Sequence, residues 1–110
     1  VGGCGTSTPT WNLFAVDTGG NVGRFASLAL DSVGGPQVAY YDSTAGNLRL
    51  AACVSGCGDA QTPAWSLRTL DSPGDVGQYA SIALTSAAQP RVSYSDVSNN
   101  DLKYFLTCGP

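Results

Sequence analysis

The sequence contains no histidine, no methionine and no glutamate, so all eight of its acidic residues are aspartate. A chain without histidine and glutamate cannot form a Ser-His-Asp triad, a histidine metal site or a glutamate acid–base pair. Lysine and arginine number five together and the net charge is −3, which leaves no basic patch for nucleic acid. Apolar runs are too short to cross a membrane. We therefore expect a non-enzymatic protein without cofactor or metal that neither binds nucleic acid nor inserts into membranes.

The residues that build long helices are also scarce, since glutamate and methionine are missing and lysine is rare. In their place the chain has 14 glycines and six prolines, and serine, threonine and asparagine are abundant. Glycine, proline, serine and asparagine form tight turns between strands. The composition predicts an all-β fold, and 110 residues are the length of one domain, residues 1–110.

The four cysteines form one Cys-x-x-x-Cys unit, Cys53 and Cys57, and two single residues near the chain ends, Cys4 and Cys108. This spacing differs from the Cys-x-x-Cys of zinc knuckles; a four-thiolate site is formally possible, but disulfides are the favoured interpretation. Disulfides persist in oxidising compartments. The chain starts at Val1 without a signal peptide, so we interpret it as a mature or excised segment and expect an extracellular or cell-surface location.

An internal repeat organises the chain. Residues 11–52 align with residues 65–106 at an offset of 54 without gaps, and 16 of the 42 pairs are identical. The identical pairs include Trp11/Trp65, Asp17/Asp71, Gly23/Gly77, Ala26/Ala80, Pro36/Pro90, Tyr40/Tyr94 and Asp42/Asp96. Chance does not give this similarity, so we expect two copies of one structural unit.

Each repeat contains four short runs that alternate apolar and polar residues and are separated by Asp, Gly, Pro and Asn. The predicted strands are 11–16, 25–30, 37–41 and 48–52 in the first repeat and 65–70, 79–84, 91–94 and 102–106 in the second. Four strands in about 50 residues match the size of one β-propeller blade.

The chain resembles a propeller repeat that is common in secreted bacterial and archaeal proteins. The resemblance rests on the strings FASLALDSVGGPQVAYYDSTAGNLRL, from Phe25, and YASIALTSAAQPRVSYSDVSNNDLKY, from Tyr79. The family pattern is Ser-(Ile/Leu)-Ala-Leu-Asp, a Gly-Pro turn, a strand ending Tyr-Tyr-Asp, and Leu-Lys-Tyr-Ala. The second repeat departs from it at Thr85, Ser95 and the pair Ala88-Gln89. The resemblance covers nearly the whole chain and implies a fold rather than a function.

In that family the strand beginning FASLAL or YASIAL is the innermost of a blade, and the strand opening with Trp is the outermost strand of the preceding blade. Residues 11–16 are then an outer strand without a blade, and the second blade lacks its outer strand. The resemblance implies two four-stranded blades whose outermost strand is permuted to the N-terminus. Two blades leave open apolar faces, so other copies of the chain are the expected partners, joined head to tail by strand exchange. A ring of six blades from a trimer is the central expectation; a longer chain containing all the blades is the alternative.

The same strand order implies the disulfide pairing. Cys53 ends a third strand and Cys57 leads into an outer strand, so these two residues would staple one hairpin. Cys108 ends the other third strand and Cys4 precedes the unpaired outer strand, so they would join two copies. The rival pairing, Cys4–Cys53 with Cys57–Cys108, would require both ends of a repeat to lie within about 6 Å between Cα atoms.

The candidate ligand residues lie where the turn before each inner strand and the turn between second and third strands share one rim. They are Arg24, Tyr41, Asp42 and Asn47 in one repeat, and Gln78, Ser95, Asp96, Asn99 and Asn100 in the other. Aromatic rings beside Asp, Asn and Arg are the usual means of holding a sugar. The alternative is that the tyrosines pack between blades and the aspartates cap turns.

Other features of the repeat favour structural roles. The loops 17–23 and 71–77 lack the lysine of a Walker loop and the ligand set of an EF-hand, so a Gly-rich turn is favoured over calcium binding. Asp31, like the loop aspartates, is expected to cap a turn. Trp11 and Trp65 are expected to pack between blades.

Two functions remain open at this point. One is a multivalent binding module, with glycans as the expected ligands; two-blade chains that form six-bladed propeller lectins have a similar architecture, although their Trp-rich motif with a binding Arg and Glu is absent here. The other is a structural subunit of an extracellular filament or surface assembly, because head-to-tail contacts need not close.

Overall fold

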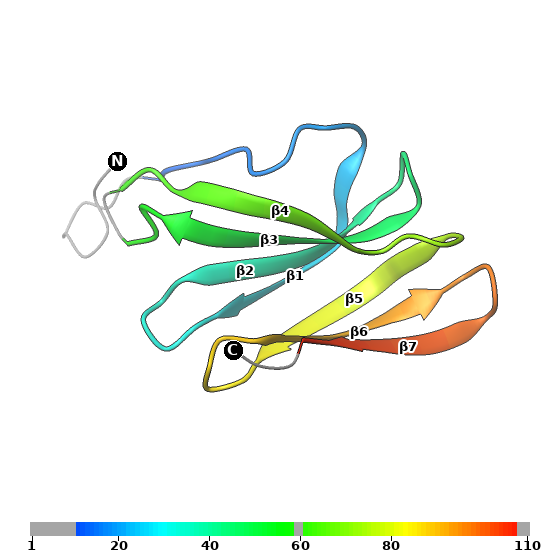
Figure 1. Ribbon diagram of the computed structural model, residues 1–110. Helices are drawn as coiled ribbons and strands as arrows, with labels where there is room; N and C mark the ends of the chain where they lie inside the picture. The colour runs from blue at the N-terminus through cyan, green and yellow to red at the C-terminus, as the bar shows by residue number, and fades with distance from the viewer. Residues whose placement is uncertain (1–10, 59–60, 108–110) are drawn as a thin grey trace.

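The computed structural model describes residues 11–58 and 61–107, and this part of the chain is all-β without any helix (Figure 1). No helix in it could therefore cross a membrane. The strands are β1 (Val22–Leu30), β2 (Pro36–Asp42), β3 (Asn47–Ser55), β4 (Ala64–Asp71), β5 (Val76–Leu84), β6 (Pro90–Asp96) and β7 (Asp101–Leu106).

The strands form two antiparallel sheets in which each strand pairs with the next one in sequence. The first sheet has the order β1-β2-β3-β4 and the second has the order β5-β6-β7. Tight turns with aspartate caps make these neighbours adjacent: Asp31 Oδ1 accepts from the Val33 and Gly35 amides after β1, and Asp42 Oδ1 accepts from the Thr44 amide after β2. The all-β prediction is confirmed at this level.

Seven of the eight predicted strands occur where the periodicity placed them, and each of these is longer by one to three residues at one or both ends. Residues 11–16, the eighth predicted strand, belong to no strand in the single chain, so their predicted pairing with a neighbouring copy stays a prediction. A strand exists only when its backbone groups pair with a neighbour. In the first sheet β4 lies beside β3, which is the place that residues 11–16 are expected to take beside β7 of a neighbouring copy.

The first strand of each sheet carries a β-bulge at the same place in the repeat. The register of β1 on β2 shifts between Arg24 and Ser27, and that of β5 on β6 shifts between Gln78 and Ser81. Phe25 and Tyr79 lie within these bulges with φ of 55° and 56°, a conformation that bulky side chains seldom adopt. The bulges turn both aromatic rings to the boundary between the sheets, where their centroids lie 4.3 Å apart.

The hydrophobic core lies between the two sheets. The first sheet contributes Ala39, Leu48 and Leu50, and the second contributes Val76, Ile82, Val92 and Tyr94. Gly77 allows the close approach, since a Cβ there would lie 2.7 Å from the Leu48 Cα and its φ of 108° suits glycine. The main buried surface of the chain is therefore a contact between sheets.

Cys53 and Cys57 form a disulfide that closes the turn between β3 and β4, with their Cα atoms 5.9 Å apart. This pairing was predicted and is confirmed. Cys4 and Cys108 lie outside the described residues, so their predicted pairing across copies stays a prediction.

Candidate functional site

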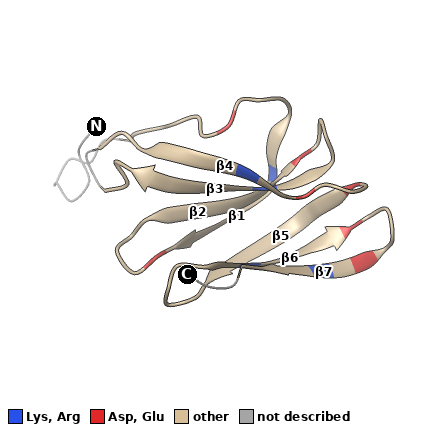
Figure 2. Cartoon of the chain, in the orientation of Figure 1, with Lys and Arg blue, Asp and Glu red and all other residues tan. Residues whose placement is uncertain are grey.

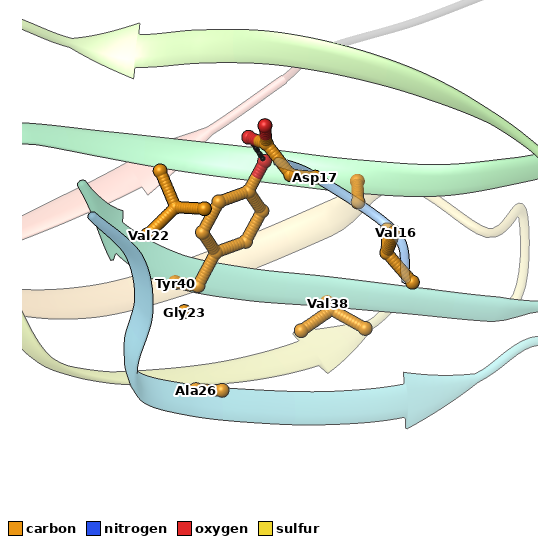
Figure 3. A pocket seen from close by; sticks show the side chains of 8 residues that line it. Val16, Asp17, Val22, Gly23, Ala26, Val38 and Tyr40 are labelled. Carbon is orange, nitrogen blue, oxygen red and sulfur yellow. Dashed lines mark hydrogen bonds between the residues drawn. The ribbon is translucent and has the colours of Figure 1, made fainter. Parts of the chain in front are cut away.

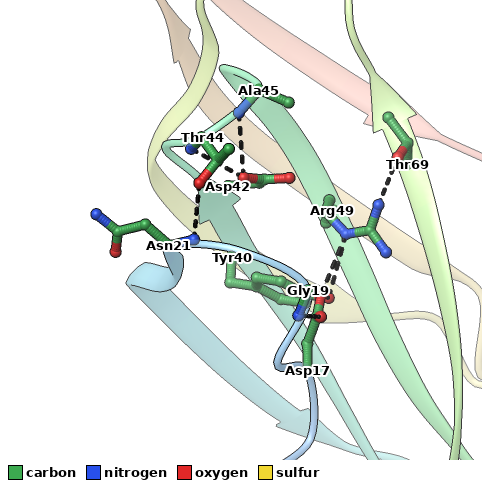
Figure 4. A network of polar contacts seen from close by, with 9 residues as sticks. All are labelled: Asp17, Gly19, Asn21, Tyr40, Asp42, Thr44, Ala45, Arg49 and Thr69. Atoms are coloured by element: carbon green, nitrogen blue, oxygen red, sulfur yellow. Dashed lines mark hydrogen bonds and ion pairs between the residues drawn. The ribbon is translucent and has the colours of Figure 1, made fainter.

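A polar cluster joins the N-terminal segment to the first sheet (Figure 4). Tyr40 Oη on β2 donates to Asp17 Oδ2 at 2.6 Å, and Arg49 Nε on β3 lies 3.3 Å from the same oxygen. The Gly19 amide donates to Asp17 Oδ1 at 2.9 Å, and Arg49 Nη1 donates to Thr69 Oγ1 at 2.8 Å. The hydrogen bond from Tyr40, followed by the one from Gly19, lowers the pKa of Asp17.

The same cluster recurs 54 residues later. Tyr94 Oη donates to Asp71 Oδ2 at 2.7 Å, and Lys103 Nζ lies 2.8 Å from that oxygen. Burial opposes the ionisation of Asp71, but the hydrogen bonds from Lys103 and Tyr94 outweigh it and lower the pKa of this carboxyl. Because Asp71 ends β4 while its partners lie on β6 and β7, this cluster ties the first sheet to the second.

The turns at one end of each sheet are also joined by matching hydrogen bonds. The Asn21 amide donates to Thr44 Oγ1 at 2.7 Å, and the Asp75 amide donates to Ser98 Oγ at 2.8 Å. The Gly-rich loop before β1 therefore contacts the β2–β3 turn, and the loop before β5 contacts the β6–β7 turn. The expected proximity of these turns is seen in the hydrogen bonds.

Direct hydrogen bonds cross between the sheets at this same end. Tyr41 Oη donates to Asp75 Oδ1 at 2.5 Å, and the Val76 amide donates to the Gly46 carbonyl at 3.0 Å. The hydrogen bond to Asp75 raises the pKa of Tyr41. Together with the Phe25–Tyr79 ring contact, these bonds make one continuous boundary between the sheets, which we call the internal junction.

An apolar hollow opens on the face of the first sheet that points away from the second (Figure 3). Its lining residues are Val16, Asp17, Val22, Gly23, Ala26, Val38, Tyr40 and Ala51. Their counterparts 54 residues later include Leu70, Val76, Ala80, Val92, Tyr94 and Phe105, which all belong to or pack on the core between the sheets. The hollow is thus the exposed equivalent of a surface that, on the second sheet, is buried against the first sheet.

The outer face of the second sheet is also uncovered, and it corresponds to the face by which the first sheet contacts the second. Leu102 is 84% exposed whereas its counterpart Leu48 is 0% exposed, and Tyr104 is 61% exposed whereas Leu50 is 1% exposed. A second, more polar hollow lies on this face and is lined by Tyr79, Ser93, Tyr94, Ser95, Asn100, Asp101 and Leu102. The chain therefore carries two open faces whose counterparts contact each other at the internal junction.

Five of the nine predicted ligand residues fall into two groups. Asp42 and Asp96 are buried and cap turns, with the Thr44 and Asn99 amides donating to their Oδ1 atoms, and Tyr41 is buried in the internal junction. Ser95 and Asn100 line the polar hollow.

The remaining predicted residues occupy various positions. Arg24 lies above the Phe25 ring, with its Cζ 5.6 Å from the centroid, and Gln78 hydrogen-bonds to Tyr41. Asn47 begins β3, and Asn99 lies on the β6–β7 turn, where its Nδ2 donates to Asp96 Oδ2.

Sequence reasoning missed Asp75 and Tyr79 as parts of this region. Asp75 was predicted to cap a turn, yet its carboxylate accepts from Tyr41 of the other sheet. The sequence pattern predicts Tyr79 only as the first residue of a strand. Its pairing with Phe25 in the repeat, both aromatic at the same position, was the signal that could have identified it.

Charge is concentrated at one end of the molecule. The aspartates of the described residues lie in loops or near strand ends, and most of them gather where the β2–β3 and β6–β7 turns lie (Figure 2). Within residues 11–58 and 61–107, no three His, Cys, Asp or Glu side chains form a group that could hold a metal ion. Comparison of the chain with protein-family models, curated proteins and solved structures gives no match.

Proposed function

We propose that the chain is a non-enzymatic, extracellular β-propeller segment that assembles with copies of itself and acts as a multivalent binding module for glycans. Each sheet would act as one blade, and the open face of the second sheet would cover the open face of the first sheet in the next copy. Six blades from three copies is the ring we propose, within the range of about four to eight blades that propellers use.

The observation that carries this proposal is the match between the two open faces and the internal junction. Leu48 and Leu50 of the first sheet pack on Val76 and Val92 of the second. The residues 54 positions after Leu48 and Leu50 are the exposed Leu102 and Tyr104, and those 54 positions before Val76 and Val92 are Val22 and Val38 beside the hollow. The same contact between two copies would therefore place Leu102 and Tyr104 of one copy in the hollow of the next. A contact between unlike faces of identical chains can repeat around an axis.

The strand exchange supplies a second element of the assembly. In the described residues β7 has a strand neighbour on one side only, and residues 11–16 belong to no sheet. The register of β3 on β4 places Cys53 opposite Trp65. The same register in the assembly would place Thr107 opposite Trp11 of a neighbouring copy, giving that indole, now 89% exposed, a sheet to lie on. Cys4 and Cys108 would then meet at this junction as an interchain disulfide.

The confirmed disulfide between Cys53 and Cys57 supports the extracellular part of the proposal, because such bonds persist in oxidising surroundings. A structural subunit of a filament or surface assembly is the second candidate. The favouring observation is that the two open faces are different surfaces, so the contact can run on as a filament when its rotation does not close.

Sedimentation velocity of the whole chain tests the self-assembly. We expect the wild type to sediment as an oligomer and the variant Leu102→Lys to sediment as a folded monomer, because the charged side chain cannot enter the apolar hollow of the next copy. Leu102 is exposed in the single chain, so circular dichroism of the variant should keep the β signal.

The variant Val54→Lys serves as the control, since Val54 is exposed but lies near the disulfide-closed turn rather than on either open face. We expect this variant to keep the wild-type sedimentation coefficient. A wild type that stays monomeric at every concentration, or a Leu102→Lys variant of unchanged size, would contradict the proposal.

A further inference from the structure

The side chain of Tyr41 fills the internal junction near its polar rim. The residue is buried, its ring centroid lies 6.0 Å from that of Phe25, and its Oη donates to Asp75 Oδ1 at 2.5 Å. Gln78 of the second sheet adds a hydrogen bond to the same hydroxyl. No space for a ligand remains at this position, because the phenol ring occupies it.

The junction between copies lacks this phenol. The residue 54 positions after Tyr41 is Ser95, and the hollow around it is open on the outer face of the second sheet. The next copy would bring Asn21 where the internal junction has Asp75, and Arg24 where it has Gln78. The place of the six-membered Tyr41 ring is therefore empty at the junction between copies, and polar groups surround it.

The chemistry around this space suits a sugar ring. The Tyr79 ring would form an apolar wall, as Phe25 does beside Tyr41, and Tyr79 and Asn100 line the hollow together with Asp101. Arg24 would supply guanidinium donors from the next copy, and Asp101 a carboxylate acceptor. An aromatic wall with directional donors and acceptors holds a pyranose by its apolar face and its hydroxyl groups.

We propose that each junction between copies holds one pyranose-binding site, built from Tyr79, Ser95, Asn100 and Asp101 of one copy and from Asn21 and Arg24 of the next. The site rests on the proposed self-assembly and refines its binding function. It predicts one sugar per chain rather than one per sheet, because Tyr41 fills the corresponding space within the chain. It also explains why the repeats differ at Tyr41/Ser95 and Arg24/Gln78: the two junctions have different tasks.

Calorimetric titration of the assembled wild type with the methyl pyranosides of glucose, galactose, mannose and fucose tests the site. We expect at least one of these probes to bind with a stoichiometry of one per chain. The variant Ser95→Tyr restores the phenol of the internal junction and should abolish binding while sedimentation shows an intact assembly. The variant Arg24→Gln copies Gln78 and should weaken binding about tenfold by removing a charged donor. Arg68→Gln, on the exposed face of β4, is the matched control and should bind as the wild type does.

The outcomes separate this site from the assembly itself. An intact oligomer that binds none of the four probes, that binds two per chain, or that still binds after Ser95→Tyr overturns the site and leaves the self-assembly standing. Tighter binding of free phenol than of every pyranoside overturns the sugar assignment. A monomeric wild type overturns both proposals, because no junction between copies would exist.

Discussion

Single aspartates hold most of the polar structure of this chain, and they do so in two ways. Asp31, Asp42 and Asp96 accept hydrogen bonds from backbone amides of the turns that follow them. Asp17 and Asp71 instead accept from a tyrosine hydroxyl and lie beside a basic side chain. Aspartate suits both uses because its short side chain reaches its own turn as well as a neighbouring strand.

The lowered pKa of Asp71 predicts a dependence of stability on pH. A carboxyl whose pKa is lowered by folding stabilises the protein at pH values above its pKa in the unfolded chain, and this contribution is lost as the pH falls through the folded pKa. The variant Asp71→Asn should unfold at a lower temperature than the wild type at neutral pH, and the difference should shrink in acid below the usual aspartate pKa. Thermal unfolding followed by circular dichroism at several pH values measures this.

The variant Asp101→Asn is the control for the same change of charge at an exposed position. We expect its unfolding temperature at neutral pH to fall by less than that of Asp71→Asn. Equal losses for Asp71→Asn at neutral pH and in acid would mean that the contacts with Tyr94 and Lys103 do not stabilise the ionised carboxyl.

The strands could be located from the sequence because their signals are local. Alternating apolar residues and Gly, Pro or Asp turns predicted seven strands that the structure contains. Residues 11–16 carry the same pattern as residues 65–70, yet only the second segment forms a strand, β4. The two segments differ in their neighbours, since β4 can pair with β3 through the short disulfide-closed turn.

Removal of residues 1–16 tests the strand exchange. The deletion would leave the β7 edge uncovered in every copy, remove the Trp11 anchor and leave Cys108 without its proposed partner. We expect monomer or aggregate in sedimentation, because an uncovered edge strand invites irregular pairing. Should the shortened chain stay soluble with an unchanged oligomeric size, the strand exchange does not hold the copies together.

The double variant Cys4→Ser with Cys108→Ser is the matched comparison, because it keeps the strand and removes the covalent link alone. We expect it to assemble but to dissociate more readily on dilution or heating than the wild type. A disulfide at such a junction contributes about 2–4 kcal/mol and removes the concentration dependence of that contact. Peptide mapping of the wild type without reductant should recover Cys4 linked to Cys108.

In the described part of the molecule the two sheets are held together by one continuous contact, and a glycine allows it. Gly77 lies against the Leu48 backbone, whereas a Cβ added at its counterpart Gly23 would meet no atom of the described residues within 4 Å. Both have φ near 100°, so an alanine would strain the backbone at either site. The two positions therefore differ in the Leu48 neighbour, which only Gly77 has among the described residues.

The variants Gly77→Ala and Gly23→Ala should consequently differ in kind. Gly77→Ala should lower the free energy of unfolding by more than about 2 kcal/mol, since about 1–3 kcal/mol of backbone strain is joined by a clash with Leu48. Gly23→Ala should cost the strain alone and still block assembly, because Leu102 of another copy would take the place of Leu48. Chemical denaturation and sedimentation measure the two effects; a Gly23→Ala variant that assembles normally would contradict the proposed docking of copies.

The sequence by itself determined seven strands, because alternation and turn chemistry act over short stretches of chain, and it determined the 54-residue offset, because the two repeats align without gaps. The Cys53–Cys57 link followed from the resemblance to propeller repeats. Only the tertiary structure decided that Tyr41 meets Asp75, that Phe25 and Tyr79 stack at paired bulges, and that residues 11–16 stay outside the sheets. The first two outcomes join residues 34 or more positions apart. The third depends on which sheet edge the segment can pair with. No local pattern encodes them, since a side chain or a backbone edge acquires its partner only when the sheets pack.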